Sequence, residues 1–175
     1  TELDYEHSIA VYLNSIGNLL FESEELGKSF ECYNLSLEID SKNVDALVKR
    51  GIIETRFNDL RSALFDFTKA ITINPFHADA YRERGVLKMK NKDDSGALSD
   101  FKKAIEINPS DAEAFCLQGT IKYGIKDYQG AISDLTKAIG IAPQDSRFYK
   151  YRAFVKNDLK DYEGAITDYT RVIEI

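Results

Sequence analysis

Apolar and small residues recur along this chain at one fixed spacing, the step from Gly51 to Gly85 and from Gly85 to Gly119, with no insertion or deletion. Within one period, four residues are separated by four, three and one positions, which places them on one face of an α-helix: Ala97, Phe101, Ala104 and Ile105. The preceding stretch carries a similar stripe around Gly85, and the polar segment 91–94 separates the two stripes. Each period therefore predicts two helices joined by a turn.

Several columns of the repeat have a physical meaning. A small-residue column on the first helix and another on the second predict close helix approach: Gly17, Gly51, Gly85, Gly119 and Ala153; Ser29, Ala63, Ala97, Ala131 and Ala165. A bulkier column is expected to fill the space that they leave: Tyr33, Phe67, Phe101, Leu135 and Tyr169. An acidic column precedes the second helix, where carboxylates cap backbone N–H groups: Glu25, Asp59, Asp93, Asp127 and Asp161. A proline column, Pro75, Pro109 and Pro143, is expected to end that helix.

One period reads Tyr81-x2-Arg84-Gly85-x2-Lys88…Ala97-x3-Phe101…Pro109. This resembles the tetratricopeptide repeat (TPR), whose pattern is W-x2-L-G-x2-Y…A-x3-F…P with a period of about 34 residues. The resemblance covers nearly the whole chain and implies an all-α fold, an α-α superhelix (TPR solenoid) of antiparallel helix pairs. Three columns depart from the family pattern, at its Trp, its Leu and its Tyr: Leu13, Leu47, Tyr81, Phe115 and Tyr149; Arg50, Arg84, Gln118 and Arg152; Leu20, Glu54, Lys88, Lys122 and Lys156.

We expect residues 1–175 to form a single TPR domain of five repeats, with 1–9 as an extension of the first helix. The repeats are 10–43, 44–77, 78–111, 112–145 and an incomplete 146–175. The incomplete repeat suggests a fragment of a longer protein. It also predicts an apolar patch of Ile166, Tyr169 and Ile173 through which the chain could form homo-oligomers.

The net charge of −6 and the pI near 5.0 argue against nucleic acid and anionic membranes as partners, since both favour basic surfaces. No apolar run approaches the roughly 18 residues of a membrane span, and the acidic start shows no signal peptide. Two cysteines without CxxC spacing or nearby histidines predict neither a disulfide framework nor a zinc site. These features favour the cytoplasm, with the bacterial periplasm as the alternative.

The sequence offers no catalytic, metal-binding or cofactor-binding constellation, so we do not expect an enzyme. His7 and His77 have no Ser or Cys partner nearby in the sequence, and both are expected to lie on the surface, His77 in a loop between repeats. Acidic pairs occur in turns, where helix capping explains them. The glycine-containing segment 119–126 lacks the residues and the position of a phosphate loop.

In proteins that resemble this one, the first helices of successive repeats line a concave groove that binds a peptide or protein. Mapping that groove onto this chain gives a near-neutral mixture of charged and apolar residues, with Arg82, Tyr123 and Phe154 as expected anchors. The candidate binding residues are Lys49, Ile52, Arg56, Arg82, Val86, Met89, Lys90, Tyr123, Arg147, Lys150 and Phe154, and the same mapping includes Val48 and Cys116.

The function predicted from this pattern is a protein–protein interaction scaffold or adaptor. Three alternatives stay open: a regulatory or substrate-docking segment of a larger enzyme, an RNA-binding repeat protein, and a self-assembling repeat protein. The acidic composition argues against RNA. The basic residues that hold a C-terminal carboxylate in one TPR subgroup are not matched, since Asp79 and Glu83 occupy two of the corresponding positions.

Overall fold

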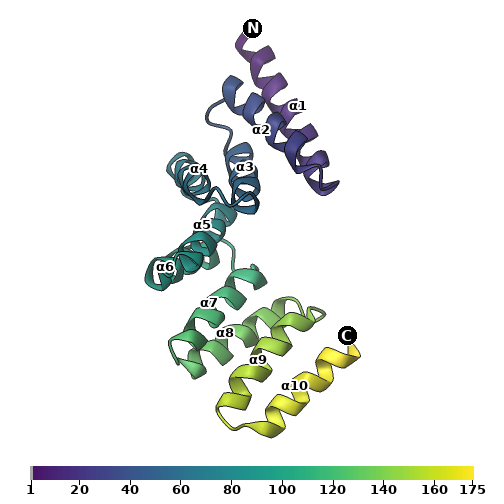
Figure 1. Ribbon diagram of the computed structural model, residues 1–175, viewed down its shortest axis with the longest axis vertical. Helices are drawn as coiled ribbons and strands as arrows, with labels where there is room; N and C mark the ends of the chain where they lie inside the picture. The colour runs from purple at the N-terminus through teal and green to yellow at the C-terminus, as the bar shows by residue number, and fades with distance from the viewer. Residues whose placement is uncertain (1) are drawn as a thin grey trace. The chain divides into compact units, whose positions relative to one another are not determined.

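The computed structural model describes residues 2–175, with side chains from residue 5 onward, and all regular structure in this range is α-helical. The helices form antiparallel pairs joined by short turns, as α1–α2, α3–α4, α7–α8 and α9–α10 show in Figure 1. The expected all-α class of helix pairs is thereby confirmed. The helices are α1 (Glu2–Glu22), α2 (Leu26–Ile39), α3 (Val44–Arg56), α4 (Leu60–Ile73), α5 (Ala78–Lys90), α6 (Asp94–Ile107), α7 (Ala112–Gly124), α8 (Tyr128–Ile141), α9 (Ser146–Asp158) and α10 (Tyr162–Glu174).

The helices of a pair pack a small residue of the first against a ring of the second. A Cβ atom added to Gly51 would lie 2.7 Å from Cε1 of Phe67, and one added to Gly17 would lie 2.7 Å from Cε1 of Tyr33. Both rings are fully buried. A larger residue at either glycine would push the helices apart, because close-packed interiors leave no space for an extra methyl group.

An aspartate side chain caps the start of four second helices among the described residues. The carboxylates of Asp59, Asp93, Asp127 and Asp161 each accept the backbone N–H three residues later, at 2.9 to 3.2 Å. The expectation that Glu25 does the same for α2 is wrong, since its side chain makes no cap hydrogen bond. Glutamate has one more methylene than aspartate, and this carboxylate instead pairs with Lys28.

The turn inside each pair places a residue other than glycine in the left-handed region. These residues occupy the same position of the five repeats, with φ between 60° and 66°: Glu24, Asn58, Lys92, Lys126 and Lys160. The next N–H then reaches the carbonyl five residues back, as from Asp127 to Lys122 at 2.8 Å, which closes the first helix with a Schellman motif. The conformation costs about 1 kcal/mol per residue, and the capped turn holds it in place.

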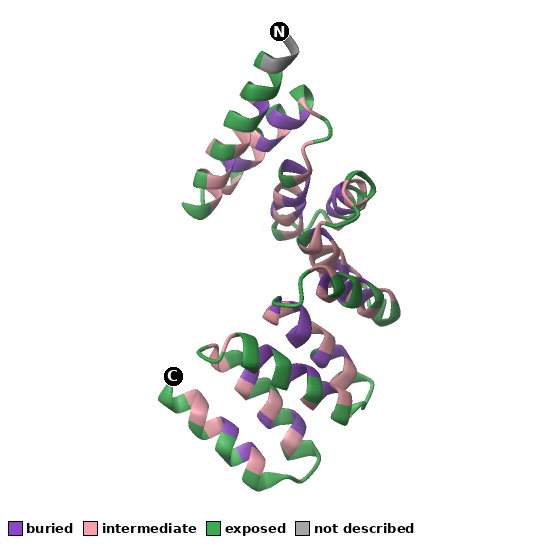
Figure 2. Cartoon of the chain, turned by 180° about the vertical axis from the view of Figure 1, so that it is seen from behind, coloured by how far each residue is buried: buried purple, intermediate pink, exposed green. Residues whose placement is uncertain are grey.

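The described chain divides into two compact units, with the boundary between Leu87 and Lys88 inside α5. Leu47, Ile53 and Phe67 are fully buried in the first unit, and Leu135, Phe148 and Val155 are buried in the second. Figure 2 shows buried positions gathered where paired helices face each other and exposed positions filling the turns. A single continuous domain over residues 1–175 stays a prediction.

Candidate protein-binding faces

Within each unit, first helices of successive repeats lie side by side. In the first unit, α1 contacts α3, and α3 lines a pocket together with the first half of α5. In the second unit, α7 contacts α9. We call the surface of α1, α3 and the first half of α5 the N-terminal face, and the surface of α7 and α9 the C-terminal face.

Two cations gather over one aromatic ring on the N-terminal face. The Lys49 ammonium lies 5.2 Å from the Phe21 ring centroid, and the Arg56 guanidinium lies 4.8 Å from the same centroid. Arg56 also lies 3.3 Å from Glu24. Cation–π contacts of this kind contribute about 0.5–1 kcal/mol each at exposed sites. They hold two basic groups in defined positions at the surface.

A small polar pocket adjoins these cations on the N-terminal face. Its volume is about 100 Å³, and it is lined by Asp45, Val48, Lys49, Ile52, His77, Asp79 and Arg82. His77 closes one side: Nδ1 accepts the Ala80 N–H at 3.2 Å, so the proton lies on Nε2, which is 3.4 Å from Asp45. The hydrogen bond from His77 and the charge of Lys49 hold the pKa of Asp45 below its usual value.

His77 lies in the loop between α4 and α5 as expected, but its side chain is not free at the surface. Its side chain is 17% exposed and caps α5, because the imidazole reaches back to the first free N–H groups of that helix. His7 lies on α1 and its Nδ1 is 3.6 Å from Asp40. Both histidines thus have structural partners.

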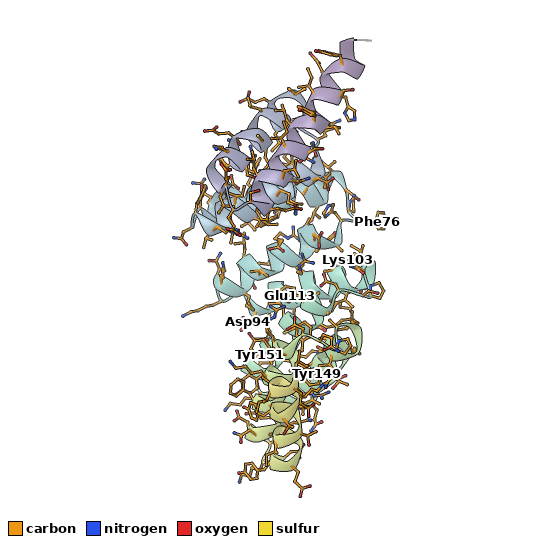
Figure 3. All side chains as sticks on the ribbon, turned by 90° about the vertical axis from the view of Figure 1, so that its right-hand side faces the viewer. Phe76, Asp94, Lys103, Glu113, Tyr149 and Tyr151 are labelled. Atoms are coloured by element: carbon orange, nitrogen blue, oxygen red, sulfur yellow. The ribbon has the colours of Figure 1, made fainter. Side chains whose placement is uncertain are left out.

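The C-terminal face is more aromatic. An apolar pocket of about 40 Å³ lies between α7 and α9, with a wall from α8: its lining residues are Gly119, Thr120, Tyr123, Leu135, Tyr151, Phe154 and Val155. Tyr151 and Phe154 are about two-fifths exposed, so their rings meet both the pocket and the solvent. Tyr149 and Tyr151 leave α9 on opposite sides, and only Tyr151 belongs to this pocket (Figure 3).

Fixed polar pairs flank this pocket. The Tyr123 hydroxyl donates to Asp158 at 2.7 Å, which raises the pKa of Tyr123. Arg147 lies 2.9 Å from Glu113 on the neighbouring helix and 2.7 Å from Asp145, the N-cap residue of its own helix. These pairs hold α7 and α9 in register and leave the apolar pocket between charged edges.

The structure places the predicted binding residues in three groups. The N-terminal face contains Lys49, Ile52, Arg56 and Arg82; the C-terminal face contains Tyr123, Arg147, Lys150 and Phe154; the end of α5, across the unit boundary, contains Val86, Met89 and Lys90. Val48 and Cys116, which the same mapping placed in the groove, are only 3% exposed. Helix position alone did not show this burial, because it does not say how deep a neighbouring helix packs.

The described residues gather no group of three or more His, Cys, Asp or Glu side chains suited to a metal ion. Burial raises the pKa of the Cys116 thiol to about 12, so its reactive thiolate form is scarce at neutral pH. None of the helices within the described residues is both long and apolar enough to cross a membrane.

A second set of charged residues lies off these faces, and the sequence pattern alone did not identify it. Four second helices carry a buried aspartate at the same position of the repeat: Asp66, Asp100, Asp134 and Asp168. Each pairs with a cation of the first helix: Arg50 at 2.7 Å, Lys88 at 2.8 Å, Lys122 at 2.7 Å, and both Arg152 and Lys156 at 2.7 and 2.8 Å. These cations occupy two of the columns that depart from the family pattern, those at its Leu and its Tyr. The period of the aspartates was a visible signal, but spacing alone did not say which columns meet.

The sequence model of the tetratricopeptide repeat matches residues 78–111 and 112–145. Together with the described helix pairs, this match identifies the chain as a TPR protein.

Solved structures that share this fold include the following three. MamA from Desulfovibrio magneticus RS-1 is 21% identical, with a TM-score of 0.79 over 94% of this chain and 93% of that one. A Pseudomonas aeruginosa pilF structure is 15% identical, with a TM-score of 0.88 over 99% and 78%. YrrB, described as a TPR protein with an unusual peptide-binding site, is 21% identical, with a TM-score of 0.71 over 94% and 85%.

One relative by sequence is an enzyme, the UDP-N-acetylglucosamine–peptide N-acetylglucosaminyltransferase of Giardia intestinalis. It is 28% identical over 61 residues, which is 35% of this chain and 4% of that protein. The chain thus spans a small part of this relative.

Proposed function

We propose that this chain is a protein–protein interaction module that binds a segment of a partner protein on its first-helix faces. The observation that carries the proposal is the apolar pocket between α7 and α9, walled by the half-exposed rings of Tyr151 and Phe154. Aromatic side chains around a pocket are common binding hot spots, because they bury much area at little entropic cost.

The size of the pocket limits what enters it. A volume of about 40 Å³ suits a small aliphatic side chain. The partner segment would therefore place a short apolar residue against Tyr151 and Phe154. Its flanking polar residues would meet Lys150 or the paired charges of Arg147 and Glu113.

The N-terminal face supports a complementary contact. Lys49 and Arg56 are held over Phe21, and Arg82 lies 2.7 Å from Asp79 at the neighbouring pocket. Basic groups whose positions are already restricted lose little side-chain entropy when they meet carboxylates. This face is suited to an acidic stretch of a partner.

A selection from a random peptide library displayed on phage, with the immobilised chain as bait, would test the C-terminal face. The Kd of an enriched peptide is then measured by fluorescence anisotropy for the parent chain and for Tyr151→Ser. We expect the variant to bind about tenfold more weakly, which corresponds to about 1.4 kcal/mol of lost contact.

Tyr162→Ser is the matched control, because Tyr162 is also exposed but lies on the second helix α10. It should leave the Kd unchanged. Equal affinities for parent and Tyr151→Ser, or equal losses in both variants, would contradict binding at this pocket.

The match to part of a glycosyltransferase favours a second candidate, a substrate-docking segment of a larger enzyme. The same faces would then hold a protein substrate for a catalytic domain elsewhere in the polypeptide. The sequence of the complete gene distinguishes the two candidates. Self-association through residues 146–175 stays a prediction.

A further inference from the structure

A pocket separate from both faces lies among α2, α3 and α4. Its volume is about 470 Å³, and its lining residues are Phe30, Asn34, Arg50, Glu54, Arg61, Ser62, Phe65 and Asp66. The inner wall is charged and buried, since Glu54 is 7% exposed and Asp66 is 1% exposed. The outer wall is aromatic, with Phe65 largely exposed on α4.

Arg50 is held inside this pocket by three hydrogen bonds. Its Nε and Nη2 donate to the two oxygens of Asp66 at 2.7 and 2.8 Å, and its Nη1 donates to Asn34 at 2.9 Å. A bidentate pair of this kind is the strong form of a charged hydrogen bond. The single N–H of Nε is used in this pair and is not available to Glu54.

Glu54 is consequently a buried carboxylate without a donor. Its Oε1 lies 3.9 Å from Arg50 Nε, which is too long for a hydrogen bond. Its Oε2 is buried and has no hydrogen-bond partner among the described residues. Burying a carboxylate oxygen in this way is costly, so a donor that reached it would be bound favourably.

The other repeats show which group fits here. The column of Glu54 continues as Lys88, Lys122 and Lys156, whose ammonium groups lie 2.7 to 2.8 Å from the buried aspartate of their own repeat. In the α3–α4 pair the ammonium is missing and a second carboxylate takes its place. The buried wall therefore carries two carboxylates against one guanidinium.

We propose that this pocket binds a primary ammonium group, and that its occupant is a lysine side chain of a partner protein whose Nζ donates to the Glu54 carboxylate. The walls of Phe30 and Phe65 suit the methylenes of a lysine and the cation itself. An ammonium fits better than a guanidinium, because Arg50 already occupies both oxygens of Asp66. This site is distinct from the first-helix faces and does not depend on them.

The charges around Glu54 set the conditions for binding. Burial, followed by the charge of Asp66, raises the pKa of Glu54 to about 7; Arg50 opposes this rise and Asp59 adds to it. Arg61, exposed at the rim, opposes a cationic ligand, although solvent screens its charge. Binding of an ammonium should therefore strengthen between pH 6 and pH 8.5, as Glu54 ionises.

The probe for this proposal is n-butylammonium, which reproduces the end of a lysine side chain. It is titrated at pH 8.5 into the full chain carrying ¹³C-labelled Glu, Asp and Phe, with 1-butanol as the uncharged control of equal length. We expect saturable NMR shifts of the Glu54 carboxyl carbon and of the Phe30 and Phe65 rings with n-butylammonium alone. Asp168, whose repeat contains its own lysine, should not shift.

Two variants complete the test. Glu54→Gln keeps the side-chain shape and should weaken binding of n-butylammonium by at least about tenfold, the effect of one charged hydrogen bond. Arg61→Ala keeps Glu54 intact and should tighten binding severalfold. Shifts that persist in Glu54→Gln or appear equally with 1-butanol would show apolar binding only and overturn the proposal. Absence of any shift in the parent chain, or weaker binding by Arg61→Ala, would overturn it as well.

Discussion

The helix pairs α3–α4 and α9–α10 surround a buried aspartate in nearly the same way. Arg50 holds Asp66 through two hydrogen bonds and reaches Asn34, and Arg152 holds Asp168 through two hydrogen bonds and reaches Thr136. They differ in the next residue of the cluster, which is Glu54 in the first pair and Lys156 in the second.

This one difference reverses the direction in which the pKa of a buried carboxyl group shifts. Burial alone would raise the pKa of Asp168, but hydrogen bonds from Arg152 and Lys156 outweigh it and hold the pKa below its usual value. In the first pair, burial and the charge of Asp66 raise the pKa of Glu54 to about 7. A shared backbone frame thus produces a neutralised cluster in one repeat and an acidic pocket in another.

The largest expected effect comes from converting the second cluster into the first. Lys156→Glu removes the ammonium beside Asp168 and adds a carboxylate there, so the free energy of unfolding should fall by about 3 kcal/mol or more. Urea denaturation of the chain, followed by circular dichroism, measures the loss. Lys150→Glu makes the same charge change at an exposed position of α9 and should cost about 0.5 kcal/mol or less. Similar losses in both variants would mean that the buried cluster has no special role.

The second-largest expected effect is a pH dependence of the free energy of unfolding, caused by Glu54 in the first unit. The folded-state pKa of Glu54 lies above its unfolded value, so its stabilising contribution is complete below about pH 4.5 and is lost as pH rises through about 7. The free energy of unfolding should fall by roughly 2 kcal/mol between pH 5 and pH 8.5. Denaturant titrations at several pH values test this, with Glu54→Gln as the variant in which the fall should disappear. A fall of the same size in that variant would assign the titration to another group.

The smallest effect comes from converting the first cluster into the second. Glu54→Lys supplies the missing ammonium beside Asp66 and should raise the free energy of unfolding by about 1 kcal/mol at pH 8, where Glu54 is otherwise ionised. Thermal denaturation at pH 8 measures the gain as a higher Tm. The gain should shrink at pH 5, where Glu54 is largely protonated in the folded chain. A variant less stable than the parent at pH 8 would show that Arg50 leaves no room for a second cation.

Local features of the fold followed from sequence because they depend on neighbours along one helix or within one repeat. The glycine and aromatic columns predicted that Gly51 would meet Phe67. The distance of 2.7 Å between a Cβ atom added to Gly51 and Cε1 of Phe67 confirms this contact. The aspartates before the second helices predicted caps, which Asp59 and Asp127 form. Capping and close packing repeat with the same chemistry in each period, so spacing alone was enough.

Other features depended on distances between helices. Val48 and Cys116 share the helical phase of the faces but are buried, and His77 is fixed between Asp45 and the start of α5. The buried aspartates were visible as a period, yet their partners come from the preceding helix of the same pair. Spacing along the sequence does not give the angle at which one helix packs on another.

By itself the sequence determined a TPR chain of paired helices, with capped turns and with small residues where helices approach, because these features recur from one repeat to the next. Only the tertiary structure decided which departures from the family pattern carry consequences. It brought Glu54 beside Asp66 and left its Oε2 without a donor, whereas Lys156 became the partner of Asp168. The physical reason is that burial and charge pairing arise between side chains of different helices, and they exist only once those helices have packed together.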